Sequence, residues 1–139
     1  MLFKCSIPVD HHISKKNSMR IWQGRVGKSP ELQIAEDVLL NKLHLERLKQ
    51  RLDHTITCDI AVKFTFVFKD YLTKKKSKKD VPRRSRKVCD LSNLFQMPED
   101  CLTKAGIIGD DSQICSYDGS RRIPGLQNRL DIEITEFKE

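Results

Sequence analysis

Residues 58–69 read CDIAVKFTFVFK, and they alternate between two kinds of side chain. One set is apolar throughout: Cys58, Ile60, Val62, Phe64, Phe66 and Phe68. The other set, from Asp59 to Lys69, mixes charged, polar and apolar residues. A period of two with one apolar face is typical of a β-strand that lies with one side on a core. The sequence therefore predicts a sheet that needs an apolar layer over one face.

One helix is predicted before this strand in the sequence and another after it. Ser29 is a good N-cap, Pro30 suits the first helical position, and apolar residues recur at helical spacing to about residue 52. A second helix is expected over residues 93–105. Pro98 lies inside it and predicts either a kink or a late start, because proline has no backbone N–H to donate.

Shorter strands are expected nearer the two ends of the chain. They cover residues 2–9, 113–117 and 129–135. Residues 10–28 are polar and contain glycines, which indicates a loop. This order favours an α+β fold: a single small domain over residues 1–139, with a mixed β-sheet of three to four strands packed against two helices.

Positive charge is concentrated in a basic loop expected at about residues 72–88, called here the basic segment. Its nine cations are Lys74, Lys75, Lys76, Lys78, Lys79, Arg83, Arg84, Arg86 and Lys87. Only Asp80 opposes them, so the chain outside this segment is close to neutral although the formal net charge is +7. Such a segment suits a nucleic acid, because neutralising phosphates releases condensed counterions. An acidic protein, a membrane surface or plain solvation are the alternatives.

The sequence lacks the signatures of several other kinds of site. The five cysteines include no CxxC pair, which argues against a zinc site and favours reduced thiols in the cytoplasm. Lys4 interrupts the first apolar residues, and no apolar run approaches ~20 residues, so neither a signal peptide nor a membrane partner is expected. Residues 24–29 lack the spacing of a P-loop, and no small-molecule cofactor is expected.

Asp90, Asp110 and Asp111 are the candidate metal ligands. A helix of ~12 residues is ~18 Å long, so Asp90 and Asp110 meet only if the strand after the helix returns beside the first strand. If they meet, their carboxylates suit Mg²⁺, which prefers oxygen ligands and activates water beside a phosphate. The alternative is structural, with Asp90 as a helix cap and Asp110–Asp111 as a turn.

Residues 89–114, CDLSNLFQMPEDCLTKAGIIGDDSQI, resemble the signature region of the RusA family. These proteins are Holliday junction resolvases of bacteria, prophages and phages. The family pattern is DLDNL, six or so residues, DALTKAG, and then a DD pair before a strand. The resemblance extends more weakly toward both ends of the chain, and the basic segment is longer here.

The resemblance implies a homodimeric endonuclease of DNA recombination and repair, acting in the cytoplasm. Such enzymes bind four-way DNA junctions and cut two opposed strands symmetrically, using Mg²⁺ held by aspartates. Asp90 matches the first essential aspartate of the family and Asp111 the last, with Asp110 as its neighbour. Asn93 matches the asparagine of the motif, and the basic segment is expected to hold the DNA backbone.

Two positions depart from the family pattern. Ser92 replaces the second aspartate of the DLDN motif, and Gln96 replaces a lysine. Each change removes a charge from the expected site, and Glu99 or Asp100 on the second helix are candidates to compensate. The alternatives are a variant that works with fewer carboxylates, a junction-binding protein with weak or no nuclease activity, and a basic RNA-binding protein.

Overall fold

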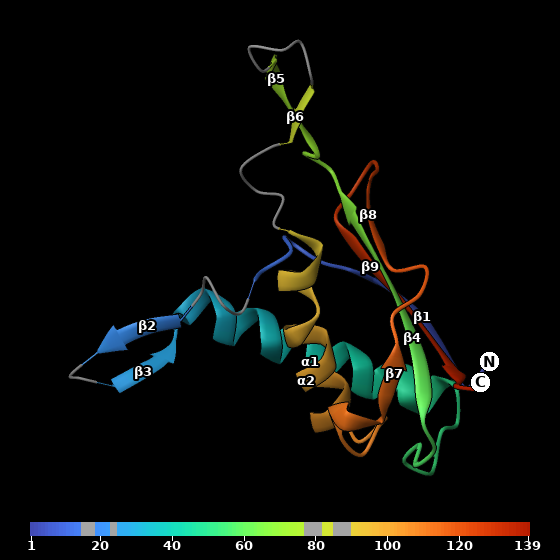
Figure 1. Cartoon of the computed structure of the whole chain (residues 1–139). Helices are drawn as coiled ribbons and strands as arrows, with labels where there is room; N and C mark the ends of the chain where they lie inside the picture. Colours follow the sequence, from blue (N-terminus) through green and yellow to red (C-terminus); the bar gives the residue numbers. More distant parts are fainter. Residues whose placement is uncertain (15–18, 23–24, 77–81, 85–89) are drawn as a thin grey trace.

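A mixed β-sheet organises this computed structural model, which describes residues 1–14, 19–22, 25–76, 82–84 and 90–139. The central strand is β4 (Ile60–Phe68), as its alternation predicts. On one side β9 (Arg129–Glu136) pairs antiparallel with β4, and β1 (Phe3–Pro8) pairs antiparallel with β9. On the other side two short strands, β7 (Ile114–Ser116) and β8 (Arg121–Pro124), pair parallel with β4. Figure 1 shows the sheet on one side of the molecule and the helices on the other.

The expected mixed sheet and the α+β fold are confirmed, but the sheet has five strands rather than three or four. The strand that was not predicted is β8, whose sequence RRIP lacks an apolar alternation. It pairs with the C-terminal half of β4, while β7 pairs with the start of β4. The sheet is therefore four strands wide, with two short strands sharing one edge of β4.

The first helix, α1 (Pro30–Lys49), begins where the sequence predicts. The Ser29 side chain accepts a hydrogen bond from the Leu32 backbone N–H at 3.2 Å, as expected of an N-cap. The helix ends three residues earlier than expected. Arg51 has a φ of 53°, a left-handed conformation that the helix cannot continue through.

The second helical segment is divided as Pro98 predicts. A 3₁₀ turn, η2 (Leu91–Leu94), comes first, and the α-helix α2 (Gln96–Lys104) starts late. Pro98 then falls in the first turn of α2. Backbone N–H groups there have no acceptor within the helix, so the missing N–H of proline costs no helical hydrogen bond. Gly106 follows the helix with a φ of 71°, which a glycine adopts without strain.

Two regions expected to be loops contain hairpins, and both expectations need correction. Within residues 10–28, β2 (Met19–Trp22) pairs antiparallel with β3 (Arg25–Lys28). Within the basic segment, β5 (Leu72–Lys76) pairs antiparallel with β6 (Pro82–Arg84). Both hairpins extend away from the body of the molecule in Figure 1, and their backbone groups pair within each hairpin.

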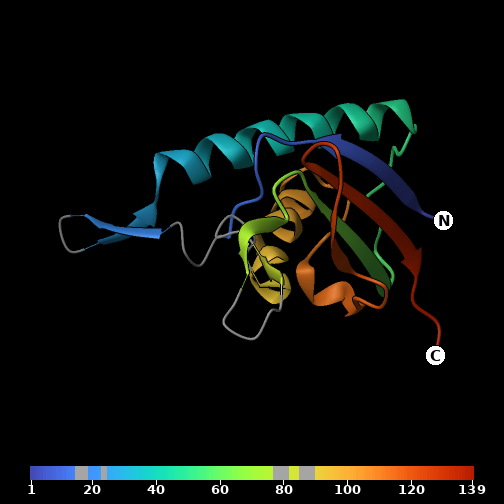
Figure 2. The ribbon, with the colours of Figure 1, turned by 90° about the horizontal axis from the view of Figure 1, so that it is seen from above.

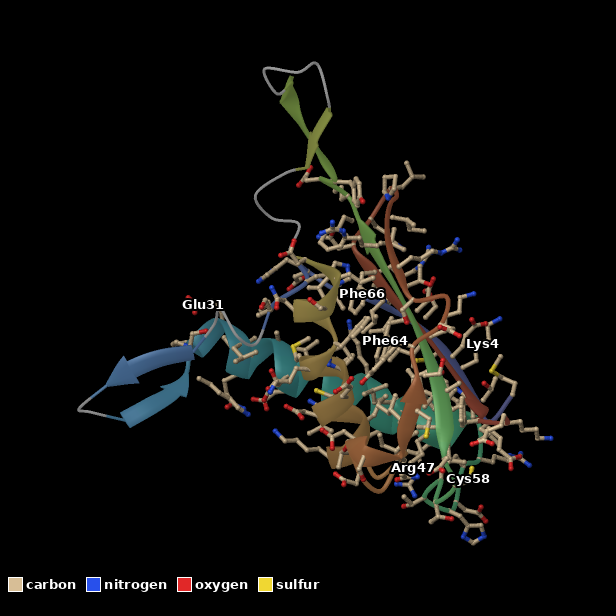
Figure 3. The ribbon with its side chains drawn as sticks, viewed as in Figure 1. Lys4, Glu31, Arg47, Cys58, Phe64 and Phe66 are labelled. Carbon is tan, nitrogen blue, oxygen red and sulfur yellow. The ribbon has the colours of Figure 1, made fainter. Side chains whose placement is uncertain are left out.

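The core lies between the sheet and the two helices. Phe64 and Phe66 project from β4 into this layer in Figure 3, and both are fully buried. They meet Leu39 from α1 and Leu102 from α2 in one continuous apolar cluster. No helix in the described parts of the chain is both long and apolar enough to cross a membrane.

A buried carboxylate links α1 to its neighbours. Glu36 is only 2% exposed, and its Oε2 lies 2.5 Å from Lys28 Nζ on β3 and 3.5 Å from Lys104 Nζ on α2. The hydrogen bond to Glu36 raises the pKa of Lys28. This one side chain therefore ties the β2–β3 hairpin and α2 to α1.

We expect Glu36→Gln to lower the free energy of unfolding by about 1–3 kcal/mol, because two lysines lose a buried charged partner. Urea denaturation measures the change. Asp37→Asn, on the neighbouring exposed position of α1, is the matched control and should change stability by less than about 0.5 kcal/mol. Equal stability of the two variants would contradict the linking role of Glu36.

Candidate functional site

Asp110 and Asp111 lie on a turn that Gln113 holds in place. Asp110 is the N-cap of a short 3₁₀ helix, η3 (Asp111–Gln113), and forms a capping box with it. The Gln113 side-chain oxygen accepts hydrogen bonds from the backbone N–H groups of Gly109 and Asp110, at 2.7 and 2.9 Å. Its amide nitrogen donates to the Ile56 carbonyl at 2.9 Å. The turn is therefore fixed against the segment that leads into β4.

The two aspartates interact with each other at the surface. Ser112 donates a hydrogen bond of 2.6 Å to Asp110 and lowers the pKa of that carboxyl. The pKa of Asp111 is raised, first by its hydrogen bond with Asp110 and then by the negative charges of Asp110 and Asp100. Both side chains are exposed, so a cation arriving from solvent would relieve this repulsion.

Glu99 on α2 belongs to the same acidic surroundings. Burial raises the pKa of Glu99, a hydrogen bond donated by the Tyr117 hydroxyl lowers it, and the charges of Asp111 and Asp100 raise it again. The Tyr117 ring is held by stacking on Phe95, with ring centroids 4.6 Å apart and planes 9° from parallel. The structure thus brings Glu99 and Asp100 within electrostatic reach of Asp111.

Tyr117→Phe tests this arrangement through the pH dependence of stability. Without the hydroxyl, the buried Glu99 carboxylate loses its hydrogen bond, and the variant should be less stable by about 1–3 kcal/mol near pH 7. The pKa of Glu99 is already raised in the folded protein, so its ionisation lowers stability as pH rises above the ordinary value of 4.5. The variant removes the bond that lowers this pKa, so its deficit should grow with rising pH.

Urea denaturation at about pH 4 and about pH 7 measures this difference. The expected deficit is small at the lower pH, where Glu99 is protonated in both the folded and the unfolded state. Tyr71→Phe is the control, because it removes a tyrosine hydroxyl elsewhere in the fold. A deficit of Tyr117→Phe that does not change with pH would contradict a role in holding the Glu99 carboxylate.

Asp90 lies apart from these groups. Its side chain is 83% exposed, and its Oδ1 lies 3.9 Å from Arg122 Nη1 of β8. It occupies the N-cap position of η2 but makes no side-chain capping hydrogen bond, so the structure does not support a role as a helix cap. Arg122 is therefore a cation beside the first motif aspartate, and sequence reasoning did not find it.

The register of β4 explains this separation. The strand after α2 does return beside β4, but Ile114 pairs with Ile60 while Arg122 pairs with Phe66. Six residues of strand correspond to roughly 20 Å. Across the residues that the structure describes, no three His, Cys, Asp or Glu side chains form a group that could hold a metal ion. Asp90, Asp110 and Asp111 therefore do not make a closed ligand set within this one chain.

The remaining motif residues surround Asp90. Ser92 is exposed within η2, and Gln96 is exposed at the first position of α2. The Asn93 backbone N–H donates to the Asp90 carbonyl at 3.0 Å, which fixes the turn that carries Asp90. A carboxylate at position 92 or a cation at position 96 would therefore lie at the open surface near Asp90.

The basic segment is described in part. The backbone of Lys74, Lys75, Lys76, Arg83 and Arg84 lies in the β5–β6 hairpin. Lys78, Lys79, Arg86 and Lys87 lie outside the described residues. The hairpin continues directly from β4, so it extends beyond the end of the sheet where β8 and Asp90 lie.

The donor types at Asp110–Asp111 fit Mg²⁺, although they supply only part of its coordination. Magnesium takes one or two protein carboxylates and completes its shell with water and substrate phosphates. Asp110 and Asp111 offer two exposed carboxylates whose mutual repulsion favours a bound cation. Sequence reasoning found these two residues through the motif and missed Gln113 and Tyr117. The D-x-x-Q pattern of residues 110–113 is a capping-box signal that points to Gln113.

The fold and the site together define a class of protein. This is a small basic α+β protein with a paired-carboxylate turn and a cationic hairpin, which suits a polymer of phosphates and a divalent cation. A comparison with protein families matches residues 14–135 to the family described as endodeoxyribonuclease RusA. A search of curated proteins found no match. Because the family match spans most of the 139 residues, the chain belongs to the endodeoxyribonuclease RusA family.

Proposed function

We propose that this protein is an endodeoxyribonuclease that resolves four-way DNA junctions by Mg²⁺-dependent nicking of two opposed strands. The observation that carries the proposal is the rigid Asp110–Asp111 turn, held by Gln113 in a chain of the endodeoxyribonuclease RusA family. We further propose that the protein acts as a homodimer in the cytoplasm. A junction with two-fold symmetry calls for an enzyme with two symmetric sites.

Asp111 and Asp110 would hold the magnesium ion. When bound, Mg²⁺ lowers the pKa of a coordinated water and stabilises negative charge at the scissile phosphate. The chain itself supplies the position of the two carboxylates, because Gln113 holds the turn through the backbone N–H groups of Gly109 and Asp110. Asp90 would act at the same DNA from the surface beside Arg122, where it keeps an exposed carboxylate.

The basic segment would bind the DNA backbone. Its lysines and arginines neutralise phosphates without reading bases, so junction shape would decide where the protein binds. Lys74, Lys75 and Lys76 sit on β5, directly after the strand that anchors the sheet. The hairpin follows β4 at the end of the sheet where Asp90 and Arg122 lie, so DNA bound there would pass beside Asp90.

A second candidate function is junction binding with weak or no cleavage. Ser92 and Gln96 remove a carboxylate and a lysine relative to the family pattern, and the described part of the chain offers no three-residue metal group. Ser92→Asp separates the two candidates. Cleavage that appears only in this variant would mean that the wild-type protein binds junctions without resolving them.

The test of substrate class is binding to a four-way junction, a linear duplex and an RNA hairpin, each titrated with salt. We expect the junction to bind at least about tenfold more tightly than the duplex at equal salt. All three affinities should fall steeply with salt, because the basic segment releases counterions. Equal affinity for the three nucleic acids would remove the junction-resolving function and favour a basic RNA-binding protein.

A further inference from the structure

Leu126 projects from the short loop between β8 and β9, which holds residues 125–128. Its side chain is 98% exposed, more than any other large apolar side chain in the residues that the structure describes. The leucine therefore adds almost nothing to the apolar core of this fold. Single exposed apolar residues are common on protein surfaces, so the loop that carries Leu126 and the surroundings of that loop decide what it means.

The β8–β9 loop crosses over the end of the central strand. β8 and β9 pair with the two opposite edges of β4, so the chain between them has to pass from one edge to the other. The crossing is close, because a Cβ atom at Gly125 would clash with Val67 Cγ1 of β4. Val67 is only 3% exposed as a result. The loop therefore packs on the sheet.

Hydrogen bonds fix the loop at both ends. The Gly125 backbone N–H donates to the Phe68 carbonyl at 3.0 Å. Asn128 Oδ1 accepts from the Lys69 backbone N–H at 2.9 Å, and Asn128 Nδ2 donates to a carbonyl in the segment after β1 at 2.7 Å. Leu126 lies between these two anchors. A tip that is held in place before a ligand arrives costs little ordering entropy when it binds.

The loop lies beside the start of the basic segment. Lys69, which bonds to the loop, opens the connection from β4 to β5. Figure 1 and Figure 2 both show the loop, in orange and red, beside the chain that leads from β4 into the β5–β6 hairpin. Arg121 is exposed on β8, a few residues before the loop. The apolar tip therefore lies among cations, at the end of the sheet from which the basic hairpin extends.

We propose that Leu126 inserts between base pairs at the crossover of a four-way DNA junction while the basic segment holds the neighbouring phosphates. This inference rests on the proposed function, because it concerns the same DNA. Phosphates and sugars offer no partner to an isobutyl side chain, whereas the faces of the bases do. Proteins that distort DNA insert leucine and other apolar side chains between base steps and partly unstack them.

Insertion at the crossover would give the protein a preference for junctions that its cations cannot give. Phosphate contacts are the same on a duplex arm and on a junction, so they bind both. Unstacking costs least where bases are already poorly held, as at a crossover where the arms of the junction end. Inside a continuous duplex the same insertion disrupts a complete stack. Leu126 is therefore a specificity residue for the junction.

Junction and duplex affinities, both measured in EDTA so that no DNA is cut, give the first test. Leu126→Ser should weaken junction binding about tenfold and duplex binding by less than about twofold at equal salt. Leu126→Met keeps an apolar tip and should bind the junction within about threefold of the wild type. Leu48→Ser is the matched control, because Leu48 is 74% exposed near the end of α1, and it should change neither affinity.

The serine variant should fold normally, since the leucine side chain is in water, and far-UV circular dichroism and the thermal midpoint check this. A Leu126→Ser variant that binds the junction as tightly as the wild type would overturn the proposal. Equal losses on junction and duplex would also overturn it, because they would indicate a contact with the DNA backbone.

Fluorescence of 2-aminopurine placed beside the crossover reports the unstacking itself, because stacking quenches this base. The wild type and Leu126→Met should raise the signal about twofold or more, and Leu126→Ser should not. The same base in the middle of one arm is the control and should not respond. A rise that persists in Leu126→Ser would contradict insertion of this side chain.

The outcomes separate this inference from the proposed function. A wild type that prefers the junction, with Leu126→Ser unchanged in affinity and fluorescence, would refute insertion alone. A wild type that unstacks the crossover through Leu126 but cuts no strand with Mg²⁺ would refute cleavage and support insertion. A wild type that binds junction and duplex equally would refute both.

Discussion

Replacing Asp111 with asparagine is expected to slow junction cleavage by about a thousandfold while leaving junction affinity within about twofold. Asp111 is the exposed carboxylate that Asp110 and Asp100 repel, which makes it the best placed to take a cation. Asparagine keeps the size of the side chain but loses the charge, and a lost metal ligand costs several kcal/mol of transition-state stabilisation. Single-turnover cleavage of a labelled junction, beside a gel-shift titration of the same junction, measures both quantities.

The fold should survive this change, because Gln113 rather than Asp111 holds the turn. Asp118→Asn is the matched control. Asp118 is an exposed aspartate in the turn before β8, and its replacement should leave cleavage unchanged. If Asp111→Asn cut junctions at the wild-type rate, Asp111 could not be a metal ligand in the reaction.

Replacing Lys74, Lys75 and Lys76 together with glutamine is expected to weaken junction binding by at least about a hundredfold near 0.1 M salt. The slope of log affinity against log salt is negative, and each phosphate contact contributes roughly 0.9 to its magnitude. Loss of three contacts should therefore reduce the magnitude of the slope by about 2–3. Filter binding over a range of salt concentrations gives both the affinity and the slope. Affinity for duplex and junction should fall together, because these residues contact phosphates rather than bases.

The matched control neutralises three lysines outside the basic segment: Lys4, Lys63 and Lys138. Lys4 and Lys63 lie 3.6 and 3.4 Å from the same Glu133 carboxylate on the open face of the sheet, which offsets part of their charge. This triple variant has the same change in net charge but should lose less than about tenfold in affinity. Equal losses in the two triple variants would show that net charge, and not the basic segment, governs binding.

The elements of the fold that could be predicted are those whose signals come from residues close together in the sequence. The alternation of residues 58–69 predicts β4, and Ser29–Pro30 predicts the start of α1, because each signal acts within one element. Pro98 likewise predicts the late start of α2. The hairpins β2–β3 and β5–β6 were not predicted, because their strands are short and lack the sustained alternation of β4. β8 was missed for a similar reason: it is short and pairs with only part of β4.

The candidate site likewise has a part that the sequence predicts and a part that it does not. The Asp110–Asp111 turn follows from the sequence motif and its capping box, both of which are local. The contact between Glu99 and Tyr117 joins residues 18 apart, and the pair of Asp90 with Arg122 joins residues still further apart. These contacts depend on how α2, β7 and β8 pack around β4, which no local pattern determines. The separation of Asp90 from Asp111 is likewise a consequence of register along β4.

The central claim is that this protein resolves four-way DNA junctions, and the most direct test is cleavage of a synthetic junction with each strand labelled in turn. The reaction is run with Mg²⁺ and, in parallel, with EDTA. We predict nicks at matching positions in two opposed strands, only in the presence of Mg²⁺, that a DNA ligase can reseal. No cleavage under any divalent cation, or equal cutting of a linear duplex of the same sequence, would contradict the account.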